Sequence, residues 1–155
     1  MDNWEWLALA QHHGLPTRLL DWTYNPLVAA FFAVEADPAS DGAIYAFKAE
    51  DIASPKREPD PLKITRVLRY LPPHVTRRIA AQQAVFTVHP QPHEELKSPD
   101  LAVGVVPSAS KEQLRFTLAR YGMRRGLLFP GLDGLAADIA WRFRVTAPLE
   151  KSNEK

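Results

Sequence analysis

The sequence contains no cysteine. This absence excludes disulfides, thiol catalysis and thiolate zinc sites, and it is compatible with a reducing compartment. The first fourteen residues carry no basic region, and their apolar run is too short for a signal peptide or a membrane span. The formal net charge of +1 offers no bulk attraction to nucleic acid or to a membrane surface. We therefore expect a soluble, cytoplasmic protein without either partner.

Proline, by contrast, is abundant, with 14 among 155 residues. Two clusters, SPKREPDPL and HPQPHEELKSPD, predict loops, because proline lacks a backbone N–H and disfavours helix at the preceding residue. No flank of these loops is long enough to form its own core, so we expect one domain over residues 3–145. The polar, aperiodic stretch 146–155 predicts a disordered tail.

Hydrophobic periodicity and capping residues predict helices and strands in irregular order, which favours an α+β fold. Asn3–His13 predicts a helix. Asn25 and Pro26 predict the start of another, whose run LVAAFFAV is apolar on every face and should be buried on most of its circumference. We expect a mixed, mainly antiparallel sheet packed against this helix. Further helices are expected over TRRIAAQQ, over KEQLRFTLARYG after a capping box of Ser110 and Gln113, and over GLDGLAADIAWRF to near Trp141, with strands over GAIYAFKA and AVFTVH.

Four segments resemble the FRG domain family, which is named for a Phe-Arg-Gly motif. They are LALAQHHGLPTRLLDWTYNPLVAAFFA, GAIYAFKA, RRIAAQQAVFTVH and LLFPGLDGLAADI, and the first is the most specific. The Phe-Arg-Gly triplet itself, which lies upstream in the family, does not occur in this chain. The chain therefore resembles the C-terminal part of the family's domain, either from a truncated gene or with the missing segment supplied elsewhere.

A second resemblance is to the central block of ADP-ribosyltransferase folds, in which a threonine ends a strand and precedes an apolar helix. It implies Thr23 and Gln82 as two of three catalytic stations, the first lying on the absent motif. It also implies NAD as substrate, for ADP-ribosyl transfer or NAD hydrolysis. We expect a ligand-binding or enzymatic domain of a bacterial effector or phage defence protein. Gln82 cannot supply the negative charge that stabilises an oxocarbenium-like transition state. Glu94 or Glu95 could supply it, but a proline-flanked loop favours solvated side chains.

The polar residues ahead of the apolar helix predict a ligand pocket, formed by His12, Thr17, Arg18, Asp21 and Trp22 together with Thr23 and Gln82. Several of these residues have a structural alternative. Thr23 could be an N-terminal cap partner of the helix that begins at Pro26. His12 could cap its helix, Arg18 could pair with Asp21 instead of clamping a phosphate, and Trp22 could be core. Adjacent His12 and His13 cannot both reach one metal ion, and a site through Asp21 lacks a third ligand, so no metal site is predicted.

The rival to a ligand-binding or enzymatic domain is a protein interaction module. Absence of an upstream strand would expose apolar helix surface and a sheet edge, and such surfaces recruit partners. Homodimerisation by completion of each other's sheet, or a partner protein over that edge, is the corresponding prediction. The arginine cluster Arg120, Arg124 and Arg125 could instead bind RNA, with a steep salt dependence, or form a solvated face.

Overall fold

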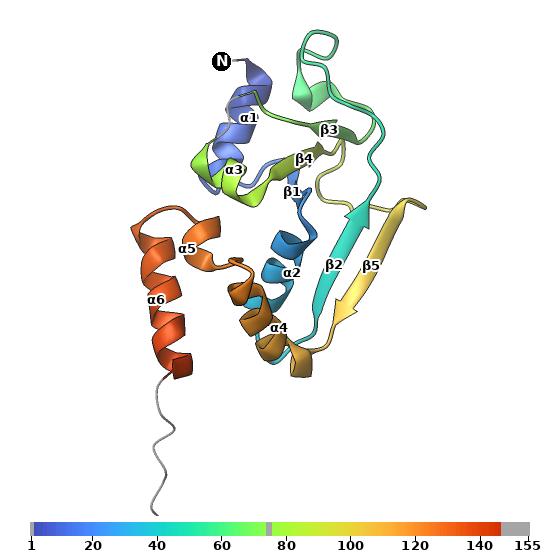
Figure 1. Ribbon diagram of the computed structural model, residues 1–155. Coiled ribbons are helices and arrows are strands. Elements are labelled where there is room, and N and C mark those ends of the chain that lie inside the picture. Colours follow the sequence, from blue (N-terminus) through green and yellow to red (C-terminus); the bar gives the residue numbers. More distant parts are fainter. Residues whose placement is uncertain (1, 74–75, 147–155) are drawn as a thin grey trace, which may run out of the picture.

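The computed structural model describes residues 2–73 and 76–146 (Figure 1). Its helices are α1 (Asn3–His12), α2 (Pro26–Glu35), α3 (Arg77–Gln82), α4 (Ser108–Arg120), α5 (Arg125–Leu128) and α6 (Leu132–Thr146), with a 3₁₀ turn, η1 (Pro61–Lys63). Its strands are β1 (Leu19–Thr23), β2 (Gly42–Phe47), β3 (Leu68–Tyr70), β4 (Ala84–Val88) and β5 (Leu101–Val106). These elements confirm the α+β class. The predicted tail lies outside the described residues from position 147 onward.

The strands form two antiparallel sheets, not the one sheet expected from the sequence (Figure 1). In the first sheet β4 is central, in the order β1-β4-β3, and the second sheet is the ribbon of β2 and β5. Helix α2 follows β1 and precedes β2, so it connects the two sheets. Strands β1 and β2 are both edge strands, and within the part of the chain that the structure describes each has a strand partner on one side alone.

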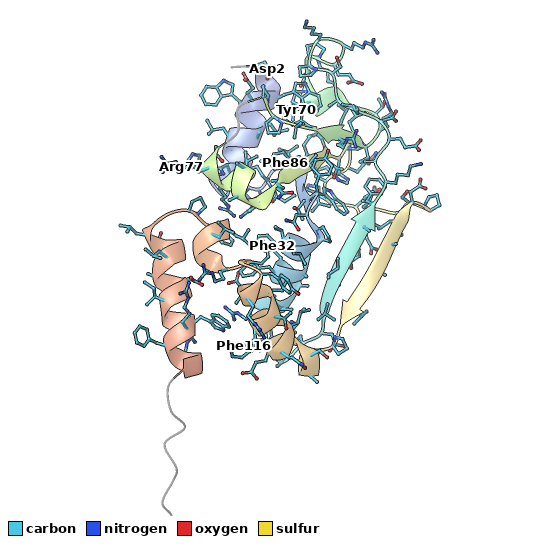
Figure 2. The ribbon with its side chains drawn as sticks, viewed as in Figure 1. Asp2, Phe32, Tyr70, Arg77, Phe86 and Phe116 are labelled. Carbon is cyan, nitrogen blue, oxygen red and sulfur yellow. The ribbon has the colours of Figure 1, made fainter. Side chains whose placement is uncertain are left out.

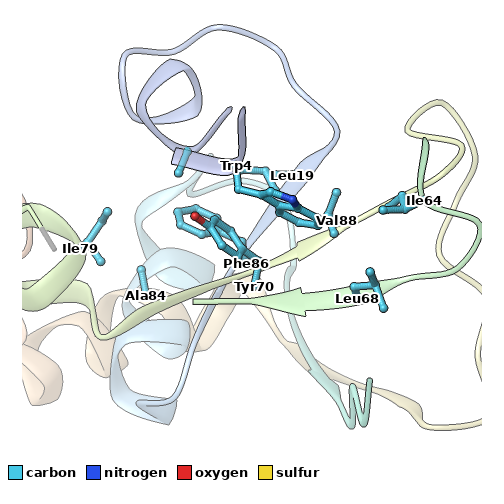
Figure 3. Close-up of a cluster of buried hydrophobic side chains, with 10 residues drawn as sticks. Trp4, Leu19, Ile64, Leu68, Tyr70, Ile79, Ala84, Phe86 and Val88 are labelled. Atoms are coloured by element: carbon cyan, nitrogen blue, oxygen red, sulfur yellow. The ribbon is translucent and has the colours of Figure 1, made fainter. Parts of the chain in front are cut away.

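Two clusters of buried side chains form the core. The first lies between α1 and the three-stranded sheet (Figure 3). At its centre the Trp4 ring lies 5.0 Å from the Tyr70 ring, and Trp4 Nε1 donates to the carbonyl oxygen of Glu58 at 2.6 Å. The second cluster joins α2, α4 and α5 through Val28, Phe31, Val34, Leu118 and Leu128. The second cluster therefore holds α2 against α4 and α5.

The start of α2 is the one predicted. Asn25 Oδ1 accepts from the backbone N–H of Leu27 at 2.9 Å, and Pro26 occupies the first helical position. Four side chains of α2 are buried, but burial is less complete than predicted, because Leu27 and Phe32 are each 40% exposed. Another apolar side, which includes Ala29 and Phe32, borders a cavity.

Two helix ends differ from the sequence prediction. Helix α4 begins at Ser108, and Ser110 is not its cap. The Asp41 carboxylate, 67 residues away, accepts from the backbone N–H of Ser108 at 2.8 Å and so serves the helix start from a remote loop. Helix α6 continues beyond Trp141 to Thr146. The short elements β3, β5 and α5 were not predicted from the sequence.

Candidate functional site

A cavity of about 770 Å³ lies between the two sheets. One side is β1, the other side is β2, and α2 forms the wall between them (Figure 2). Residues from α1 and α3 also contribute. Apolar side chains dominate the lining, among them Trp22, Phe32, Ala33, Ile44 and Tyr45. Helix α2 therefore has two apolar sides because one packs in the core and the other faces this cavity.

Most of the residues predicted as a site lie around this cavity. His12, Asp21, Trp22, Thr23 and Gln82 all line it, and they come from α1, β1 and α3. The sequence positions span 70 residues between His12 and Gln82, so the fold brings them together. Thr17 and Arg18 are not among the residues that line it.

Thr23 and Gln82 meet, but their polar groups are used within the fold. Thr23 Oγ1 donates to the Gln82 carbonyl oxygen at 2.7 Å and accepts from the backbone N–H of Asn25 at 3.0 Å. Gln82 Nε2 donates to the carbonyl oxygen of Leu128 at 3.0 Å. The hydroxyl has a single proton, and that proton is engaged in joining β1 to the end of α3.

Asp21 and Thr17 belong to one hydrogen-bonded chain through Gln11. Gln11 Nε2 donates to Asp21 Oδ2 at 3.0 Å, and Gln11 Oε1 accepts from Thr17 Oγ1 at 2.7 Å. Thr17 Oγ1 also accepts from the backbone N–H of Leu19 at 3.0 Å. Thr17 thus acts on the cavity indirectly, by fixing Gln11, which in turn orients the Asp21 carboxylate.

Arg18 holds loops together. Its Nη1 lies 3.5, 3.3 and 3.5 Å from the carbonyl oxygens of Pro61, Leu62 and His89. These partners are 43 to 71 residues away in the sequence. In the structure Arg18 therefore connects backbone segments; it neither pairs with Asp21 nor lines the cavity as a phosphate-binding residue.

Trp22 forms part of the cavity wall through a buried relay. Its Nε1 donates to Thr87 Oγ1 at 2.8 Å, and Thr87 Oγ1 lies 2.7 Å from His89 Nε2. The hydroxyl of Thr87 accepts from the indole N–H and pairs with His89 Nε2, whose role as donor or acceptor depends on the imidazole tautomer. Burial lowers the pKa of His89 and so favours the neutral imidazole. The Trp22 ring lies 5.7 Å from the Phe47 ring of β2, which links the two sheets.

His12 lines the cavity as a neutral side chain at pH 7. Partial burial lowers its pKa most, followed by the nearby positive charge of Arg78. The His13 ring lies 5.3 Å away, edge to face. His12 therefore contributes hydrogen-bonding atoms and no charge.

The charged lining is predominantly acidic. It holds four carboxylates and two cations, which gives a formal charge of −2 with His12 neutral; the carboxylates are Asp21, Asp37, Asp41 and Glu95, and the cations are Arg78 and Lys111. Lys111 is only 3% exposed, and its Nζ donates to the carbonyl oxygens of Asp37 at 2.8 Å and Ala36 at 3.4 Å. The Lys111 ammonium group is therefore already bound by backbone carbonyl groups at the end of α2.

Sequence reasoning missed several residues of this lining. Arg78 and Lys111 belong to no recognisable motif. Phe32 and Tyr45 lie in segments whose apolar residues predict a helix and a strand but no ligand site. Glu95 was weighed and set aside as a solvated loop residue; it is exposed, yet it borders the cavity. Spatial convergence of these positions depends on contacts between the two sheets, which no local pattern records.

The fold and the cavity define an α+β domain with a site of ligand size between two sheets. A family model described as the FRG domain matches residues 1–42. This match confirms the resemblance carried by the first of the four segments, and it covers α1, β1 and α2, which supply much of the cavity wall. No curated protein and no solved structure matches the chain. No described helix combines the length and apolarity needed to cross a bilayer.

Proposed function

We propose that this domain is a binding module whose ligand occupies the cavity between β1, α2 and β2. The observation that carries the proposal is the convergence of five predicted side chains on one cavity of about 770 Å³. Ligand sites in proteins commonly enclose about 300–1,000 Å³ and combine apolar walls with a few polar groups. This cavity has both properties.

Binding agrees with the geometry better than catalysis does. The proton of Thr23 is engaged by the Gln82 carbonyl, and the Gln82 amide is neutral and bonded to Leu128. A reacting centre would need a mobile proton or a positioned charge at these two positions. We therefore assign Thr23 and Gln82 to the structure of the wall and not to a reaction.

The acidic lining favours a neutral or cationic ligand. Two unit charges about 4 Å apart interact by roughly 1 kcal/mol even at the dielectric constant of water, which is about a fivefold change in affinity. Trp22, Phe32 and Tyr45 provide aromatic surface for a planar group. A planar cation fits both features.

A matched pair of fragments tests this proposal. Benzamidine and benzoate have similar rings and opposite charges, and both dissolve at the millimolar concentrations that weak fragments require. In two-dimensional NMR titrations we expect benzamidine to shift the backbone amides of Asp21, Thr23 and Ala43, and we expect benzoate to bind more weakly by a factor of at least about five.

Cavity filling supplies the control. Ala29→Trp places an indole in the cavity from α2, and we expect it to weaken benzamidine binding at least tenfold. Ala109→Trp adds the same side chain at an exposed position of α4 and should bind like the wild type. Unchanged binding in Ala29→Trp, or shifts centred away from the cavity, would overturn the proposal.

NAD-directed chemistry is the second candidate. The volume of the cavity favours it, and so does the position of Arg78, because this cation lines the cavity and could bind a phosphate group of NAD. Calorimetry with NAD and an assay for released nicotinamide test it. Saturable NAD binding with nicotinamide release, both lost in Arg78→Ala, would favour an enzyme over a binding module. If the wild type shows neither binding nor release, this candidate is wrong. A bacterial effector or phage defence role remains a proposal tied to the same chemistry.

A further inference from the structure

The backbone of β1 presents unpaired groups to the cavity. At the end of the β1–β4 ladder the N–H of Tyr24 donates to the carbonyl oxygen of Gln83, its opposite residue, at 3.2 Å. Hydrogen-bonded pairs alternate along an antiparallel ladder. Trp22 therefore bonds to β4, whereas the backbone N–H and C=O groups of Asp21 and Thr23 point away from β4, toward the free edge.

The same alternation holds for β2. The N–H of Lys48 donates to the carbonyl oxygen of Asp100 at 3.2 Å, and this pair continues the register of the β2–β5 ladder. The backbone groups of Ala43 and Tyr45 consequently point away from β5. Both residues line the cavity, as Asp21 and Thr23 do.

The cavity is thus bordered by two strand edges whose hydrogen-bonding groups face outward from their own sheets. Within the part of the chain that the structure describes, no hydrogen bond joins the backbone groups of Asp21, Thr23, Ala43 or Tyr45 to any residue outside their ladders. Between the edges lies the apolar side of α2. An added strand needs these features, namely edge donors and acceptors together with an apolar surface for alternate side chains.

Resting on the proposed function, we propose that the occupant of this cavity is an extended peptide segment of another protein, added as a strand to the free edge of β2. The β2–β5 ribbon has two strands, and such ribbons are marginal until a third strand or a packed layer supports them. Alternate apolar side chains of the segment contact α2. The formal charge of −2 on the lining selects a segment that carries lysine or arginine.

Selection from a displayed library of random nonapeptides identifies the segment, and calorimetry measures its affinity. We expect enriched peptides to alternate apolar residues and to contain at least one basic residue. Single N-methylation along a selected peptide should weaken binding at least fivefold at every second residue and little between them, because only alternate amides face an edge. An N-methyl profile without this period of two overturns the proposal.

Two proline variants test which edge is used. Ala43 and Val105 lie opposite each other in the ladder, and both N–H groups point away from it. Proline is tolerated at such edge positions because no ladder bond is lost. Ala43→Pro removes a donor that faces the cavity and should weaken peptide binding at least fivefold. Val105→Pro removes one at the opposite edge of the ribbon and should leave binding within twofold.

The outcomes separate this inference from the proposed function. If no peptide is enriched while benzamidine still binds in the cavity, the strand proposal is wrong and the binding module stands. If neither binds, both are wrong. Peptide binding that Val105→Pro weakens and Ala43→Pro does not would place the partner on the outer edge of β5. Should Ala43→Pro fail to fold, the N-methyl profile on the wild-type protein still decides.

Discussion

Replacement of Thr23 by valine measures whether its hydroxyl serves the fold or a ligand. Valine has nearly the shape of threonine but leaves the Gln82 carbonyl and the Asn25 N–H without their partner. A buried group left without a partner costs about 1–3 kcal/mol. Because Thr23 is partly exposed and water can reach the site, we expect the free energy of unfolding to fall by about 1–3 kcal/mol in total for the two groups. In a domain of this size that corresponds to a melting temperature lowered by roughly 2–12 °C.

Urea denaturation followed by circular dichroism measures the change, and Thr23→Ser is the control. Serine keeps the hydroxyl, so its free energy of unfolding should stay within about 1 kcal/mol of the wild type. Benzamidine affinity should stay within twofold in both variants once they are folded. If Thr23→Val is as stable as the wild type but loses the ligand, the hydroxyl belongs to binding and our assignment of Thr23 is refuted.

Two further predictions concern stability. Because burial lowers the pKa of His89 in the folded protein, the unfolded chain takes up this proton first, and the free energy of unfolding should decrease as pH falls below about 6.5. His89→Gln should flatten this decrease in urea titrations between pH 7 and 5.5; an identical slope in both proteins would show that the burial of His89 does not cause this pH dependence. A Cβ on Gly42 would overlap the carbonyl oxygen of Ala33, whereas Gly131 has open space around it. Gly42→Ala should therefore lose about 1–3 kcal/mol and Gly131→Ala less than about 0.5 kcal/mol, and equal losses would show that β2 and α2 are not in close contact.

Local features of the fold were predictable from the sequence because they depend on neighbouring residues. Asn25 and Pro26 set the start of α2 through one side chain and one ring, and the run around Tyr45 has the residue types of a strand. The position of His12, Trp22 and Gln82 around one cavity was predicted from the polar residues ahead of the apolar helix and from the ADP-ribosyltransferase resemblance. Of the FRG resemblance, only the segment within residues 1–42 is matched by a family model.

Long-range contacts account for what the sequence did not reveal. The cap of α4 comes from Asp41, and the partners of Arg18 are carbonyl groups of the distant turn η1 and of His89. Neither contact has a sequence signature. An apolar run such as that of α2 has the same pattern whether its side chains meet a core or an open cavity. The division of the strands into two sheets depends on the pairings of β1 with β4 and of β2 with β5, which join segments far apart in the sequence.

The most direct test of the binding site is a residue-resolved map of the amide shifts that benzamidine induces in the wild type and in Ala29→Trp. We predict saturable shifts at Asp21, Thr23, Ala43 and Tyr45 in the wild type, and their loss in the variant. An exposed apolar stripe on α6 offers the competing surface; its residues are Leu132, Leu135, Ile139 and Phe143. Shifts centred on that stripe, or equal in both proteins, would contradict a ligand site between the two sheets.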